Sequence, residues 1–196
     1  MDRYSPLPTA RVQPGTVIAQ ARDWQDQPVT LDSPAIAVMT DLTRVKAATV
    51  HPSTTLRQAE QFMINQGVRM LFVVSNMPTI EGLVTSTDLH GDTQMRLVQQ
   101  RNVHYDDLRV ADVMVGLRDL DAIEHEVMKL ATVDNLIATL RRYGRNHLLV
   151  VEAPTAESPR RIRGVISRAQ IERQLGAPVA VTEVANTFAD VVQMLS

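Results

Sequence analysis

The sequence contains no cysteine among its 196 residues, which excludes disulfides, thiol nucleophiles and the usual zinc motifs. This composition fits a reducing compartment. Aromatic residues make up only 4% of the chain, so the core has to consist of aliphatic side chains and methionine. The net charge of −2 provides no electrostatic basis for binding nucleic acid or an anionic membrane.

Targeting and membrane-spanning patterns are also missing. Residues 1–8 (MDRYSPLP) lack the apolar core of a signal peptide. No apolar run approaches the roughly 20 residues of a transmembrane helix. We therefore expect a soluble, cytoplasmic protein. The hydrophobic content of 44% is typical of a folded globular chain.

Signatures of catalysis are not found either. The sequence has no Walker A motif, no Gly-x-Gly-x-x-Gly motif and no visible set of nucleophile, base and orienting residue. The histidines are scattered and show no ligand-pair spacing: His51, His90, His104, His125 and His147. We expect neither an enzyme nor a metal site, and no permanent cofactor.

The chain does contain an internal repeat. Residues 66–74 read QGVRMLFVV, and residues 143–151 read YGRNHLLVV. Each copy follows a helical apolar pattern and precedes a Gly-apolar-apolar-Ser/Thr segment, at 82–88 and 164–170. Such a duplication predicts two similar half-domains that pack on each other, and it directs attention to the crevice between them.

Each repeat predicts the same order of elements, namely strand, helix, strand, strand. In the first repeat the strands are expected at 45–50, 70–74 and 82–84, and in the second repeat at 148–151 and 164–166. The intervening helices start after Thr54 or Thr55 and after Thr132, with Leu56, Ala59, Phe62 and Met63 on the buried face of the first. Gly67 and Gly144 stand where these helices have to end.

The segments around the repeats are shorter or less regular. Residues 1–33 contain four prolines and are predicted to form an extended arm. Ser33 and Pro34 predict the start of a short helix at 35–40, with a counterpart at 110–115. The repeats occupy 34–101 and 106–176, and 177–196 are predicted to be a C-terminal amphipathic helix capped by Thr182. The fold class is α/β (α+β), with a small sheet and flanking helices in each repeat and a pseudo-twofold arrangement.

The ordered set of motifs, occurring twice, resembles the CBS domain, named after cystathionine β-synthase. The features that carry the resemblance are a Val-Met pair near each start, the segment 55–59 (TLRQA), the Gly-x-x-x-apolar-Val-Val strands and the Gly-x-x-Ser/Thr-x-x-Asp motif. Together they span roughly residues 34–176. The resemblance implies a disc-like tandem pair with clefts for AMP, ADP, ATP or S-adenosylmethionine.

The same resemblance implies regulation rather than catalysis. Ligand occupancy would be passed to an effector protein that the sequence does not identify, and such modules often form homodimers. A ligand-free interaction or dimerisation scaffold is the alternative.

Asp88 is the main candidate for ligand binding in the first repeat. In the family pattern this aspartate accepts the two neighbouring hydroxyls of a ribose. The Thr85 hydroxyl is placed to meet ribose or phosphate, and the backbone N–H groups of Thr87 and Asp88 favour an anion. The alternative is structural: Thr85 caps a helix and Asp88 complements its dipole.

The second repeat departs from the pattern, because Gln170 replaces the expected aspartate. Ser167 keeps the hydroxyl, and Arg168 offers donors for a phosphate or is simply solvated. We therefore expect unequal clefts, with stronger nucleoside binding at Asp88. Thr49 in the first strand and His147 at a strand start are further candidates, although ordinary surface and packing roles remain open for both.

Overall fold

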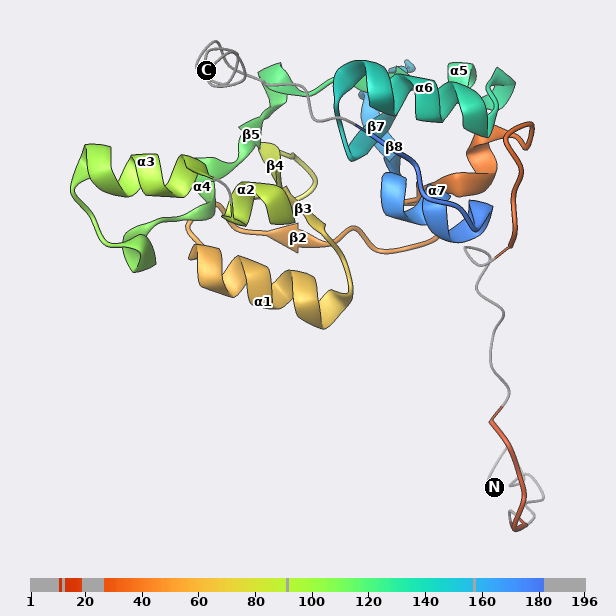
Figure 1. Ribbon diagram of the computed structural model, residues 1–196, viewed down its shortest axis with the longest axis horizontal. Helices are drawn as coiled ribbons and strands as arrows, with labels where there is room; N and C mark the ends of the chain where they lie inside the picture. The colour runs from red at the N-terminus through yellow and green to blue at the C-terminus, as the bar shows by residue number, and fades with distance from the viewer. Residues whose placement is uncertain (1–10, 12, 19–26, 91, 157, 182–196) are drawn as a thin grey trace, which may run out of the picture.

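The computed structural model describes residues 11, 13–18, 27–90, 92–156 and 158–181, which form two four-stranded mixed sheets with flanking helices (Figure 1). The strand order in the first sheet is β2 (Thr49–Val50), β3 (Met70–Val73), β4 (Gly82–Thr85) and β5 (Val115–Gly116). The order in the second sheet is β1 (Met39–Asp41), β8 (Arg161–Ser167), β7 (His147–Glu152) and β6 (Ala122–Glu124). The expected α/β class is confirmed.

The two sheets and their helices repeat the same design. The first repeat has α1 (Leu56–Gln66) and α2 (Ser86–His90), and the second has α6 (Val133–Tyr143) and α7 (Arg168–Leu175). The remaining helices are α3 (Asp92–Arg101), α4 (Val110–Val113) and α5 (His125–Leu130), with short 3-10 turns η2 (Ala35–Val38), η3 (Tyr105–Asp107) and η4 (Leu117–Asp119). None of the helices described is long and apolar enough to span a bilayer.

The boundaries of α1 and α6 confirm the sequence prediction. Thr55 and Thr132 each accept a hydrogen bond from the third backbone N–H of the helix, and Gln58 and Asn135 complete reciprocal capping boxes. Gly67 and Gly144 end the helices with φ of 64° and 58°. A glycine is favoured there because it has no Cβ to clash in the left-handed region.

Each sheet is completed by a strand from the other half of the chain. β1 precedes α1 in the sequence but pairs antiparallel with β8, whereas β5 follows α3 and α4 but pairs antiparallel with β4. Arg163 fixes this exchange at the second sheet by donating two hydrogen bonds to Asp41 at 2.9 and 2.8 Å and one to Glu152 at 2.7 Å. The Arg163 hydrogen bonds, aided by Thr43, hold the pKa of Asp41 well below its usual value.

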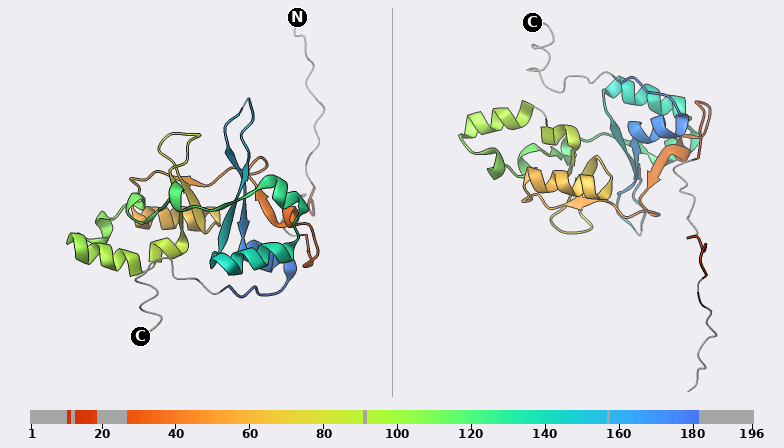
Figure 2. Two further views of the ribbon diagram at one scale, coloured as in Figure 1. Left: turned by 90° about the horizontal axis from the view of Figure 1, so that it is seen from above. Right: turned by 60° about the horizontal axis from the view of Figure 1, so that its bottom comes forward.

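Alternating side chains separate the core into layers. In β3, Leu71 and Val73 pack against the helices of the first repeat, whereas Met70 and Phe72 face the second sheet. Leu149 and Val165 of the second sheet complete this central layer. The views in Figure 2 show the two sheets side by side between the helices of the two repeats. The two halves therefore pack on each other through an apolar layer to which both sheets contribute.

Several details differ from the sequence prediction. The expected helix at 35–40 is only the turn η2, because the chain enters β1 at Met39, and Ser33 accepts from the Thr30 N–H instead of capping. The first strand is limited to Thr49–Val50, and Phe62 is 42% exposed. The predicted helix at 184–195 and its cap Thr182 lie outside the described residues, as does most of the arm at 1–33.

Candidate functional site

The predicted ligand-binding residues cluster at the ends of the hairpin strands. Thr85 is the last residue of β4 and pairs with Met70 at the start of β3. Ser167 is the last residue of β8 and pairs with His147 at the start of β7. The two repeats therefore present equivalent strand-to-helix junctions.

Strand register places these residues on the sheet faces that meet. Thr85 pairs with Met70, and Thr49 pairs with Phe72, so both lie on the face of the central apolar layer. His147 precedes Leu149 by two positions, and Ser167 follows Val165 by two, which gives them the corresponding face of the second sheet. Four of the predicted residues thus lie on the facing sides of the two sheets, although they come from four different strands.

Two arginines, one from each repeat, lie close to His147. Burial, together with the positive charges of Arg69 and Arg168, lowers the pKa of His147 to about 4. The imidazole is therefore neutral near pH 7 and offers one donor and one acceptor. We call Arg69, Thr85, His147, Ser167 and Arg168 the junction cluster.

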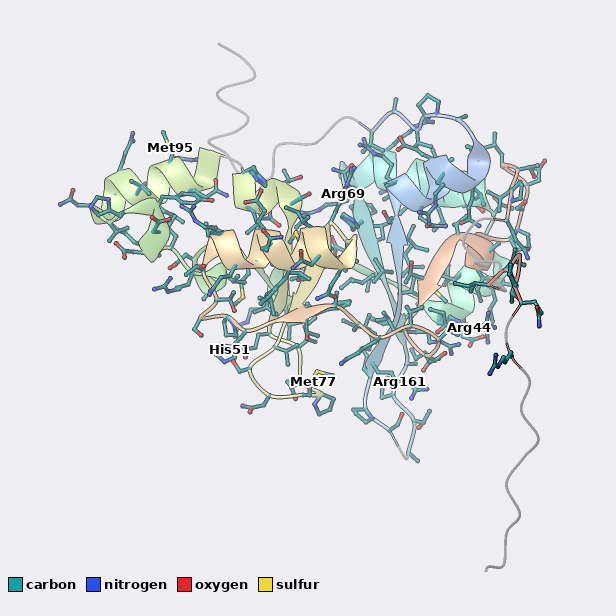
Figure 3. All side chains as sticks on the ribbon, turned by 90° about the horizontal axis from the view of Figure 1, so that it is seen from below. Arg44, His51, Arg69, Met77, Met95 and Arg161 are labelled. Atoms are coloured by element: carbon teal, nitrogen blue, oxygen red, sulfur yellow. The ribbon has the colours of Figure 1, made fainter. Side chains whose placement is uncertain are left out.

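The two arginines of the junction cluster have little acidic compensation. The Arg168 Nε atom lies 3.7 Å from a Glu172 carboxylate oxygen. The guanidinium of Arg69 forms no ion pair within the described part of the chain, and Figure 3 shows this residue between the two repeats. An excess of cationic donors beside two hydroxyl groups suits a phosphate or another anion.

Thr85 and Asp88 form a reciprocal pair at the start of α2. The Thr85 N–H and hydroxyl both donate to Asp88 Oδ2 at 2.7 Å, and the Asp88 N–H donates back to the Thr85 hydroxyl at 3.4 Å. The structural alternative considered for this pair, a helix cap, is therefore present. The contact between Asp88 and a ribose remains a prediction.

The second junction differs in its helix cap. Ser167 precedes α7 but makes no side-chain capping bond. The buried Gln170 amide donates to Gln174 at 2.7 Å and accepts from Arg173, so it is bonded within its own helix. The structure therefore places Thr49, Thr85, His147 and Ser167 on the facing sides of the two sheets, with the charge of Arg168 acting on His147. Thr87 is exposed on α2, and Gln170 is buried on α7.

Arg69 was not predicted from the sequence. It stands immediately before β3, in the position that Asn146 takes before β7. The only sequence signal for Arg69 was its position in the repeat, directly before Met70, which is the counterpart of His147. The electrostatic effect of Arg69 on His147 joins residues nearly 80 positions apart, and local patterns carry no information about it.

Comparisons with known proteins agree with this architecture. Residues 37–91 match the family model described as "CBS domain". An uncharacterised conserved protein from Pyrococcus horikoshii is 20% identical with a TM-score of 0.51, covering 73% of this chain and 92% of its own. CBSX2, a CBS-pair protein of Arabidopsis thaliana, was solved in complex with AMP and is 19% identical with a TM-score of 0.50, covering 72% and 93%. No curated protein sequence matches the chain.

Proposed function

We propose that this chain, in which residues 37–91 match the CBS-domain model and which has the fold of CBS-pair structures, is a regulatory module that binds an adenine-containing ligand and signals occupancy to a partner. The proposed ligands are AMP, ADP, ATP and S-adenosylmethionine. The complex of CBSX2 with AMP supports the choice of ligand class by analogy.

The junction cluster is the observation that carries this proposal. It consists of cationic and hydroxyl groups from both repeats, at the strand-to-helix junctions of the two sheets. We assign Arg69 and Arg168 to the ligand phosphates, and the Thr85 and Ser167 hydroxyls to phosphate or ribose oxygens. Asp88 is proposed to accept ribose hydroxyls at the first junction.

Signalling would follow from binding across the repeats. A ligand that contacts Arg69 in the first repeat and Arg168 in the second favours the relative orientation in which both contacts are made. The free energy available for this shift equals the difference in ligand affinity between the two orientations. The partner would recognise a surface that changes with that orientation.

A thermal-shift panel tests the ligand class. AMP, ADP and ATP should raise the melting temperature, whereas adenosine should raise it less because it lacks the phosphate. Arg69→Ala should abolish most of the response, and Arg118→Ala, which removes an exposed arginine of η4, should preserve it. A response to S-adenosylmethionine alone would contradict the phosphate assignment, and no response to any ligand would favour the scaffold alternative.

Calorimetry on paired variants tests whether the two clefts are unequal. Asp88→Ala should reduce nucleotide affinity more than Gln170→Ala, since Gln170 is bonded within α7. Asp88→Asn keeps an acceptor and separates loss of the ribose contact from loss of the helix cap. Equal losses in Asp88→Ala and Gln170→Ala would refute the inequality.

A further inference from the structure

A cavity of about 350 Å³ opens between α1 and α2 in the first repeat, away from the central apolar layer. Met63, Ile64, Val68 and Leu89 provide its apolar lining, and Glu60, Arg69 and His90 are its charged or titratable lining residues. His90 Nε2 donates to Glu60 Oε1 at 2.9 Å. We call this cavity the α1–α2 groove.

The matching place in the second repeat is already filled. Residues 177–181 follow α7, and Val179 is 3% exposed within the apolar cluster that contains Leu140 and Ile171. By alignment of the helix ends and hairpin strands, Leu140 corresponds to Met63 and Ile171 to Leu89. An apolar side chain of the chain itself therefore occupies the α6–α7 position whose counterpart is open.

Two polar side chains hold this segment by its backbone. Arg141 donates from Nε to the Ala180 carbonyl at 3.0 Å, and the Val179 N–H donates to Glu172 at 2.9 Å. Arg141 corresponds to Ile64 and Glu172 to His90. In the first repeat α2 is followed by α3, whose Leu97 and Val98 pack against the cluster that contains Met63 and Leu89. The residues that line the groove nevertheless end at His90, so the described part of the segment after α2 supplies no equivalent of Val179 there.

We propose that residues 182–196 of this chain dock in the α1–α2 groove and insert an apolar side chain there, as Val179 does in the second repeat. The segment offers Val184, Phe188 and Val191 as inserting groups. It carries two acidic residues and no basic one. Glu60 of the groove is paired with His90, so Arg69 is the lining charge that these two carboxylates complement.

The end of the described chain lies on the correct side of the molecule. The segment after α7 runs along α6 toward the first repeat (Figure 2). Arg141, which binds Ala180, lies in the last turn of α6, just before the His147 strand, and His147 is close to Arg69 of the groove. Fifteen extended residues span up to about 50 Å, so the length of the segment does not limit the docking.

A single spin label tests the proposal, because the chain has no cysteine of its own. In Ser196→Cys carrying a nitroxide, the backbone amides of 63–69 and 86–90 should lose NMR intensity, while those of α5 should not. Ile64→Asp should restore the intensities, since Ile64 lines the groove and is 64% exposed. Leu130→Asp, at a 90% exposed position on α5, is the matched control and should leave the broadening in place.

The segment itself is probed in the same way. Phe188→Asp should abolish the broadening, whereas Asn186→Asp adds the same charge and should retain it. Unchanged intensities in the labelled protein would overturn the proposal. Broadening that occurs only when unlabelled ¹⁵N protein is mixed with spin-labelled ¹⁴N protein would assign the groove to a second copy and also overturn it.

Discussion

The two repeats share a backbone plan but use their polar positions differently. At the first junction Thr85 and Asp88 bond to each other, whereas at the second Ser167 makes no capping bond and Gln170 is bonded to its own helix. The helix caps at Thr55 and Thr132, in contrast, are the same in both repeats. The residues that set the helix boundaries are therefore alike in the two repeats, whereas the polar residues at the strand-to-helix junctions differ.

The helical layers differ as well. On α6 four residues are buried (Val133, Leu136, Ile137 and Leu140), and Val179 covers part of this layer. On α1 three residues are buried (Leu56, Ala59 and Met63), and the α1–α2 groove reaches Met63. Equivalent buried side chains of α1 and α6 therefore differ in how much of the structure covers them. Truncating these side chains and measuring the stability tests this difference.

The largest expected effect separates Leu140 from its counterpart Met63. Leu140→Ala should lower the free energy of unfolding by about 4 kcal/mol, because the covered site leaves a closed cavity. Met63→Ala should lower it by about 2 kcal/mol, because water can enter the vacated volume from the groove. Urea unfolding followed by circular dichroism gives both values. Equal losses would indicate that the two helical layers are equally sealed.

An intermediate effect concerns pH at the second junction. The pKa of His147 is about 4 in the folded protein, below its ordinary value of 6.5, so the unfolded chain binds more protons between these values. Stability should therefore fall as the pH decreases from 6.5 to 4, with His147 contributing about 2 to 3 kcal/mol to the loss.

The first repeat supplies the variant for this test, because Met70 occupies the place of His147. His147→Met should flatten the pH dependence of the unfolding free energy between pH 6.5 and 4 relative to the unmodified chain. His104→Met, at an exposed position before η3, is the control. An unchanged slope in His147→Met would show that this imidazole does not titrate at a depressed pKa.

The smallest expected effect compares the two junction hydroxyls. Thr85→Ala should destabilise the protein by about 1 kcal/mol, the usual result of losing a side-chain cap. Ser167→Ala should change stability by less than about 0.5 kcal/mol, since this serine forms no capping bond. Thermal unfolding without ligand measures both. A greater loss for Ser167→Ala would contradict the difference between the junctions.

Local chemistry made much of the fold predictable from the sequence. The caps at Thr55 and Thr132, the left-handed glycines at 67 and 144 and the paired hairpin strands all rest on interactions within a few residues. The position of Thr85 at a strand-to-helix boundary follows from the same local signals.

The missed features depend on contacts between distant segments. The strand Met39–Asp41 looked like part of a helix because its pairing partner, β8, lies more than 120 residues further along the chain. Phe62 fits the helical apolar pattern, yet it is 42% exposed. Arg69 joins the junction cluster only because the two sheets pack face to face. Periodicity identifies an apolar face but not what covers it.

The exchange of β1 and β5 should keep the two halves of the chain associated after backbone cleavage. A protease cut between α3 and α4 would leave β1 on one fragment and its pairing partner β8 on the other, and it would likewise place β4 and β5 on different fragments. The Arg163–Asp41 ion pair would then connect two separate polypeptides. Such a nicked protein should stay together as a non-covalent complex and come apart only on unfolding.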